Sequence, residues 1–209
     1  MNLNENTAEL IVVIMGDGNI YRKNRKYRIG FTGNTETDRD YYEYLKKLIL
    51  KEWNKDAKIK IRSGGLRIVI NSKEACNYLI DEIGMPYGEG KCEKIFIPDF
   101  ILCDWNLTRH LIRGLFDTDG TVFVARKPRV EKYPSIELTT TSRILAEQVK
   151  ETLEKKGFRV AKIWKYKSKL GKRMSYRVPL NGQDNLRKWI DEIGFSNPWK
   201  LERAVSYLK

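Results

Sequence analysis

The sequence predicts an α+β protein built from two similar halves that form one compact unit. An apolar stretch runs into an Asp-Gly pair twice, at residues 10–18 and at residues 112–120. The string Ile-Asp-Glu-Ile-Gly also occurs twice, beginning at Ile80 and at Ile190. Alternating apolar and polar residues, typical of half-buried strands, occur after each Asp-Gly pair. These repeats indicate a tandem duplication in which each half reads helix, two strands, helix, two strands, helix.

In the first half, the opening helix is predicted over Glu5–Met15, where Asn4 or Asn6 can cap it. Ser72 is expected to cap the closing helix, which runs through Ile83 and ends at Gly84. Between them we expect strands at 19–22 and 27–32, a helix from Thr37 or Asp38 to about Trp53, and a hairpin of strands 58–62 and 66–71.

In the second half, the opening helix is predicted over Thr108–Asp117. The next helix starts at Thr141 or Ser142 and ends at Gly157. The other expected elements are strands 121–126 and 135–140, a hairpin of 159–167 and 174–180 that turns near Gly171, a helix over 182–193 and a last helix over 198–208 that Pro198 opens.

The connection between the halves, residues 84–107, is rich in Gly and Pro, as a loop should be. We therefore divide the chain into a first half at residues 1–90, a linker at 91–106 and a second half at 107–209. Because the linker is short, the two opening helices are expected to pack side by side. Each half alone is small for an independent core.

The charge of the chain favours a polyanionic partner. It contains 40 Lys and Arg against 27 Asp and Glu, a net charge of +13. In residues 58–62 the basic side chains alternate with isoleucines, which predicts a basic sheet face opposite an apolar one. Residues 159–177 hold eight basic residues and no acid. The alternative is an ordinary solvated face, but such faces usually mix both signs of charge.

A two-stranded ribbon of this kind is of a size that fits the major groove of DNA. In the second-half hairpin we expect the basic residues on one face and Trp164, Tyr166, Met174 and Tyr176 on the other. The residues predicted to bind nucleic acid are Arg28, Lys58, Lys60, Arg62, Lys165, Lys167, Lys169, Arg173 and Arg177.

Several other classes of protein are excluded. The N-terminus lacks the basic and apolar regions of a signal peptide, and the longest apolar run, Leu10–Met15, is far too short to cross a membrane. We therefore expect a cytoplasmic protein. The three cysteines, which show no CxxC spacing, argue against a disulfide framework and a zinc site. His110 is the only histidine, which excludes histidine-based metal or triad chemistry.

Asp17 and Asp119 are the candidate catalytic residues. Each lies where an apolar helix meets a glycine and a strand, 102 positions apart. For one Asp-Gly pair alone, a helix end beside a turn is the better interpretation. The duplicated pair instead predicts two carboxylates brought together at a pseudo-two-fold axis, where they can hold divalent metal ions.

These features resemble the LAGLIDADG family of homing endonucleases, above all its single-chain archaeal and intein-associated members. Residues 112–120, Ile-Arg-Gly-Leu-Phe-Asp-Thr-Asp-Gly, are a close match to the family motif. The segments Ile97–Ile101, Thr139–Ser142 and Ile193–Lys200 also look like the family. No segment resembles the splicing blocks of an intein, so we expect a free-standing chain.

The resemblance implies two saddle-shaped antiparallel sheets that straddle DNA, with the two motif helices at the central interface. It implies that Asp17 and Asp119, helped by the carbonyls of Gly16 and Thr118, hold Mg²⁺ or another divalent cation such as Mn²⁺ at the scissile phosphates. The metal would activate the attacking water and stabilise the leaving oxygen. Basic residues beside the two sites would be Lys91, or Lys94, and Lys200.

The chain also departs from the family pattern. Val12 stands where the family prefers a small residue, whereas Gly114 keeps one in the second copy. Because small residues let helices approach closely, Val12 predicts a wider or shifted crossing. Where polar residues often follow the second strand of each half, this chain has Gly33-Asn34 and Thr140-Thr141, with no lysine.

The leading functional prediction is a monomeric, Mg²⁺-dependent endonuclease for intron homing, which cuts both strands of a long pseudopalindromic DNA target. The second is a protein of the same fold without cleavage, either a DNA-binding regulator or an RNA splicing cofactor (maturase) for which intron RNA is the partner. A third, a generic basic RNA-binding protein, accounts for the charge but not for the two aspartates. No membrane partner is expected.

Overall fold

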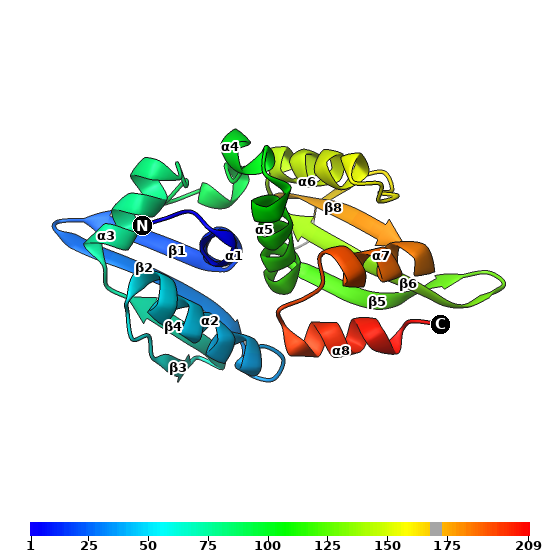
Figure 1. Cartoon of the computed structure of the whole chain (residues 1–209), viewed down its shortest axis with the longest axis horizontal. Helices are drawn as coiled ribbons and strands as arrows, with labels where there is room; N and C mark the ends of the chain where they lie inside the picture. Colours follow the sequence, from blue (N-terminus) through cyan, green and yellow to red (C-terminus); the bar gives the residue numbers. More distant parts are fainter. Residues whose placement is uncertain (168–172) are drawn as a thin grey trace.

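The computed structural model describes residues 1–167 and 173–209. The two halves flank a central pair of helices, α1 (Glu5–Gly16) and α5 (Trp105–Thr118), and each half carries its own sheet (Figure 1). Within each half the order of elements is that predicted, and the two halves are pseudosymmetric. Their division at residues 90 and 107 stays a prediction.

The first half begins with α1, which Asn4 caps through a hydrogen bond from the Thr7 N–H. Its remaining elements are β1 (Gly18–Lys23), β2 (Lys26–Asn34), α2 (Arg39–Trp53), β3 (Ile59–Arg62), β4 (Gly65–Ile70) and α3 (Lys73–Asn77). The helix predicted through Ile83 changes character, because α3 continues as a π-helical turn over Tyr78–Glu82. It ends at Gly84, whose positive φ of 76° favours glycine.

The second half repeats this plan after two short helices in the linker, at Lys91–Glu93 and α4 (Asp99–Leu102), which the sequence did not predict. After α5 it contains β5 (Gly120–Lys127), β6 (Val130–Thr140), α6 (Arg143–Lys155), β7 (Trp164–Lys167), β8 (Met174–Asn181), α7 (Gln183–Glu192) and α8 (Pro198–Ser206). The predicted strand 159–167 is shorter than expected, since only an isolated bridge at Val160 precedes β7.

The two sheets share one topology, with strand orders β1-β2-β4-β3 and β5-β6-β8-β7 and every pairing antiparallel. In the first sheet, Ile20, Ile29 and Ile68 are buried on one face, whereas Arg28 and Lys60 are exposed on the other. The alternation predicted over residues 58–62 holds for the basic residues, but Ile61, near the end of an edge strand, is 66% exposed.

Helices α1 and α5 form the interface between the halves. A Cβ added at Gly114 would lie 2.3 Å from Val12 Cγ1, so the valine of α1 fills the space that glycine leaves on α5. The departure at Val12 is therefore matched by the small residue retained in the second copy. Residues 7–15 of α1 are all buried, because partner helix and sheet together surround it.

The interface also contains a buried ion pair. Arg113 donates to Glu9 over 2.6 Å, and the Glu9 side chain is fully buried. Tyr44 Oη donates to the same carboxylate over 3.1 Å, and Arg113 also donates to His110 Nδ1 over 2.9 Å. Breaking one partner of such a pair leaves a buried charge without compensation. The ion pair has no symmetric copy, because the residues equivalent to Glu9 and Arg113 in the other half are Leu111 and Ile11.

The predicted face assignment in the β7–β8 hairpin is wrong. The register pairs Trp164 with Arg177 and Lys165 with Tyr176, and directly paired residues share a face. Lys165 and Lys167 therefore lie on the face of Tyr176 and Met174, while Trp164 and Tyr166 accompany Arg177. The alternation within each strand was right, but the turn between strands decides which sets of side chains match. Lys169 and the turn at Gly171 lie outside the described residues.

The Val12–Gly114 contact predicts the effect of Gly114→Ala. In an open helix this change stabilises by about 1 kcal/mol. Here the new methyl would collide with Val12, so we expect the free energy of unfolding to fall by about 1–3 kcal/mol in urea denaturation. Adding Val12→Ala should recover part of this loss, which would show as a non-additive double-mutant cycle. A Gly114→Ala protein as stable as the parent would contradict this packing.

Candidate metal and nucleic-acid site

Asp17 and Asp119 occupy equivalent positions at the ends of the two central helices. Each is the C-cap residue, and its N–H donates to the carbonyl four residues earlier, Val13 O over 3.1 Å and Leu115 O over 2.9 Å. The next residue must be glycine: a Cβ at Gly18 would lie 2.5 Å from Ile14 Cα, and one at Gly120 2.4 Å from Phe116 O. The Asp-Gly pair therefore ends the helix and starts the strand in one step.

The close approach of the helices brings the two acids together. A Cβ at Gly16 would lie only 2.5 Å from Asp119 Oδ2 and 2.9 Å from Thr118 Oγ1. The Asp119 carboxylate therefore lies against the end of α1, next to Asp17 in the chain. The glycine of the first motif leaves room for the acid of the second, which explains why residue 16 is a glycine.

Both carboxylates hold their protons more tightly than usual. Desolvation and the charge of Asp17 together raise the pKa of Asp119 to about 7, against the opposing charges of Lys200 and Lys91. Water reaches the Asp17 side chain, but the protein atoms packed on its inner side raise its pKa to about 6 by desolvation, with Asp38 adding to the effect. Among the described residues, neither Asp17 nor Asp119 forms a salt bridge.

Lys91 and Lys200 bind the ends of the two helices rather than the carboxylates. Lys200 Nζ donates to Phe116 O over 2.8 Å, Asp117 O over 2.6 Å and Gly120 O over 2.7 Å, and also contacts Thr118 O at 3.3 Å. Lys91 Nζ donates at the matching positions, to Ile14 O over 3.0 Å and Met15 O over 3.3 Å, and to Gly18 O. These carbonyls are the negative end of each helix. Lys94, the alternative, is exposed.

A third acid, Asp117, connects the second helix to the C-terminal segment. Its fully buried carboxylate accepts the N–H groups of Ser196 and Asn197, over 2.9 and 3.1 Å. Burial raises its pKa to about 7. Asn197 in turn donates to Asp38 over 2.9 Å. The chain from Asp117 through Asn197 to Asp38 crosses from the second half to the first beside the site.

The residues present fit a small, hard cation. Among residues 1–167 and 173–209, no three His, Cys, Asp or Glu side chains come together as a complete cage. Mg²⁺ commonly takes only one or two carboxylates and completes its shell with waters and substrate phosphates. Two adjacent carboxylates that repel each other and lack a cationic partner suit this mode of binding better than a closed protein cage.

The exposed face of the first sheet is strongly basic. A cavity of about 410 Å³ is lined by residues of β2, β3 and β4 and of the chain directly before β3 and after β4, namely Arg28, Asp56, Lys58, Lys60, Arg62, Arg67, Val69 and Asn71. All four basic residues predicted for this half are among them. Arg67 was missed, although its alternation with Leu66 and Ile68 is a visible signal. We call this set, without Asp56 and Val69, the first basic face.

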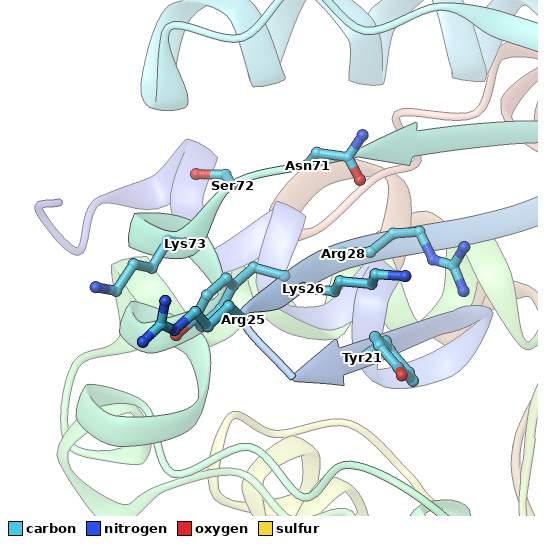
Figure 2. A pocket seen from close by; sticks show the side chains of 8 residues that line it. Tyr21, Arg25, Lys26, Arg28, Asn71, Ser72 and Lys73 are labelled. Carbon is cyan, nitrogen blue, oxygen red and sulfur yellow. The ribbon is translucent and has the colours of Figure 1, made fainter. Parts of the chain in front are cut away.

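The basic surface continues to the far end of the sheet. A second cavity of about 650 Å³ shares Arg28 and Asn71 with the first. Figure 2 shows its lining side chains, which come from β1 and β2 with the turn between them and from the junction of β4 and α3. Arg25 and Lys73 were missed because turns and helix starts carry no strand alternation to mark them, and Lys26 begins β2 one residue before the predicted strand.

The second sheet presents a smaller basic face. Arg177 stacks on Tyr166, with the guanidinium carbon 4.3 Å from the ring centroid, and pairs with Glu137 over 3.4 Å. Trp164 beside it is 67% exposed. Arg173 pairs with Glu93 of the linker over 2.7 Å. Five residues were predicted to bind nucleic acid here. Among those that the structure describes, Lys165 and Lys167 lie on the other face and Arg173 is paired with the linker, which leaves Arg177.

The described part of the chain contains no helix long and apolar enough to span a membrane.

Residues 106–194, most of the second half, match the model of a family described as LAGLIDADG-like domain. The fold of the whole chain is that of the homing endonuclease I-DmoI. A structure of I-DmoI with DNA and Ca matches with a TM-score of 0.66 at 19% identity, covering 97% of this chain and 96% of the other.

The N-terminal LAGLIDADG domain of WhiA also shares the fold, with a TM-score of 0.56 at 16% identity, covering 91% of this chain and 81% of the other.

The curated relatives are much longer proteins. A replication factor C small subunit of Methanocaldococcus jannaschii is 33% identical over 99% of this chain, which spans only 10% of that protein. A tRNA-splicing ligase RtcB of Pyrococcus furiosus is 25% identical over 97% of this chain and 23% of its own length. The matching segment thus occurs inside proteins with unrelated names. The match to the family model shows that residues 106–194 form a LAGLIDADG-like domain, and the whole chain shares the fold of I-DmoI, with its two pseudosymmetric halves.

Proposed function

We propose that this protein is a site-specific, divalent-metal-dependent endonuclease that cuts both strands of a DNA duplex. The observation that carries the proposal is the pair of carboxylates, Asp17 and Asp119, held side by side without a cationic partner at the junction of two basic sheets. Structures of I-DmoI, which shares this fold, contain DNA with Mn, Mg or Ca. Neither the replication factor nor the RNA ligase accounts for this arrangement, since the matching segment is a minor part of each.

In this proposal, Asp17 and Asp119 hold Mg²⁺ or Mn²⁺ with help from the carbonyls of Gly16 and Thr118. The bound metal supplies a lowered pKa for water and stabilises the charge that develops on the leaving oxygen. The chain itself holds the two acids at a fixed separation, through the contact at Gly16 and through the helix ends that Lys91 and Lys200 bind. We assign these lysines a positioning role, because their protons are donated to carbonyls.

The two basic faces would hold the DNA backbone on either side of the acids. The first basic face supplies six polar or charged side chains around one cavity, whereas the second sheet supplies Arg177 with Trp164 and Tyr166. Such faces give affinity that depends on salt, while the arginines can also read base edges. Mg²⁺ in particular, the monomeric state, a long pseudopalindromic target and a cytoplasmic setting remain parts of this proposal.

A second candidate is a protein of the same fold that binds DNA, or intron RNA as a maturase, without cutting. The observation that favours it is that neither lysine beside the acids has a free amine to aim at a phosphate. The deciding experiment incubates plasmids that carry candidate insertion sites with the protein, with Mg²⁺ or Mn²⁺ and with EDTA. Linear or nicked product that EDTA abolishes supports the endonuclease, and retarded but intact DNA supports the binding protein.

Asp17→Asn and Asp119→Asn should each abolish or cripple cleavage. The change removes the charge that attracts the cation but keeps the shape of the side chain, so DNA affinity should stay within about twofold, because phosphate contacts to the basic faces dominate it. The measurements are cleavage of a plasmid target and affinity in a gel-shift titration. Variants that cut at the parental rate would remove these acids from the mechanism.

The raised pKa values predict how the metal-free protein responds to pH. A carboxyl that binds its proton more tightly when folded than when unfolded stabilises the fold at low pH and loses that contribution as pH rises through its folded pKa. For Asp119, at about 7, and Asp17, at about 6, the loss begins above the ordinary aspartate pKa of 3.8 and is complete by about pH 8, so it covers most of the range from pH 5 to 8. Asp117 adds to the same fall.

In EDTA, the Tm of the parent should therefore fall from pH 5 to pH 8. Asp119→Asn should melt about 2–4 °C above the parent at pH 8, and its Tm should vary less with pH. Mg²⁺ should raise the Tm of the parent at pH 8 and leave that of the variant unchanged. A parent Tm that rises over this range would contradict the assignment.

The corrected register predicts which basic residues bind DNA. Lys60→Ala and Arg67→Ala should each lower the salt slope of binding by about one, as expected for a lost phosphate contact. Arg177→Ala should also weaken binding. Lys165→Ala, in the same hairpin as Arg177 but on the opposite face, is the matched control and should leave affinity and slope unchanged. Equal effects at Arg177 and Lys165 would mean that the face of the hairpin does not matter.

A further inference from the structure

Tyr42 places a hydroxyl group beside the first-half acids without a visible structural purpose. Its side chain is 3% exposed, and its Oη is buried with no hydrogen-bond partner. A buried hydroxyl that lacks a partner normally destabilises a fold. Tyr42 lies in the first turn of α2, which begins after Asp38. Asp17 and Asp38 are the carboxylates near enough to add to the rise in the pKa of its phenol.

Gly33 explains how the tyrosine reaches this position. A Cβ added at Gly33 would lie 2.6 Å from Tyr42 Cε2 and 2.8 Å from its Oη, so the phenol occupies the space of the side chain that β2 lacks there. Gly33 is near the end of β2, which pairs with β1 directly after Asp17. The polar group absent from the strand at this point is thus supplied by the neighbouring helix.

In the second half the hydroxyl comes from the strand and the small residue from the helix. The register pairs Phe31 with Gly18 and Leu138 with Gly120, so Thr140 is the counterpart of Gly33. Helix α6 starts after Ser142 as α2 starts after Asp38, so Ala146 is the counterpart of Tyr42. Glycine with tyrosine in one half therefore replaces threonine with alanine in the other, and each pair provides one hydroxyl. That of Thr140 accepts the Ser142 N–H over 3.1 Å.

We propose that Tyr42 is a positioning residue of the first-half site, where its hydroxyl donates a hydrogen bond that orients Asp17 when DNA and a divalent cation are bound. This inference rests on the proposed endonuclease function. Burial and the two nearby carboxylates raise the pKa of the phenol, so it stays protonated and acts as a donor. The two sites are then unequal, because the first uses a phenol and the second an aliphatic hydroxyl.

Tyr42→Phe tests the inference by removing one oxygen and keeping the ring over Gly33. The substrate is a supercoiled plasmid whose target is selected from a randomised library with Mn²⁺. We expect cleavage of one strand to slow about tenfold, so that nicked circles accumulate, while the plasmid concentration at half-maximal rate and the Tm stay at parental values. Tyr78→Phe is the matched control, since its hydroxyl is equally buried and unpartnered and lies away from the acids.

A rescue experiment separates positioning from packing. Tyr42→Ala should be slow on the same strand, and adding Gly33→Thr should restore part of that rate, because the double variant copies the Thr140 and Ala146 arrangement. Parental rates on both strands with Tyr42→Phe would overturn the inference, as would a loss of Tm and of DNA affinity in place of the rate. A parent protein that leaves every plasmid intact would instead overturn the endonuclease function, and the inference with it.

Discussion

The packing of α1 against α5 is the constraint on which the rest of the structure depends. Val12 fills the space above Gly114, and Gly16 leaves room for Asp119. A larger residue at Gly114 or Gly16 would push the helices apart. Because the two acids are at the helix ends, they would move apart as well. The strands follow at once through Gly18 and Gly120, so the positions of both sheets depend on the same contact. The packing of α1 against α5 therefore determines both the placement of the sheets and the geometry of the site.

The site holds two carboxylates close together although their negative charges repel each other. Desolvation raises the cost of ionising Asp119, and the neighbouring charge of Asp17 adds to it. The lysines offset the effect from behind the helix ends, where they bind carbonyls and leave the carboxylates open to a cation. Such a site is less stable empty than filled, which is the usual relation between a functional site and the fold that holds it.

The sequence was sufficient to predict what depends on local spacing. The Asp-Gly pairs, the helix starts at Asn4 and Ser142 and the glycine stops at Gly84 and Gly157 all follow from short-range chemistry. It was insufficient where two distant segments had to be matched. The face shared by Trp164 and Arg177 depends on the register of a hairpin, and the carbonyl contacts of Lys200 depend on where α8 packs. Arg67 was within reach of the alternation argument, whereas Tyr42 required knowing that Gly33 faces it.

Pseudosymmetry holds for the backbone and fails for the side chains at the site. The sheets have the same strand order, and the lysines bind matching carbonyls. Yet Met15 has Asp117 as its counterpart, Gly16 has Thr118, and Leu111 is the counterpart of Glu9. A homodimer could not make these distinctions, because each change would appear twice. A single chain with two motifs can tune each half separately, which under the proposed endonuclease function would suit a DNA target whose two halves differ in sequence.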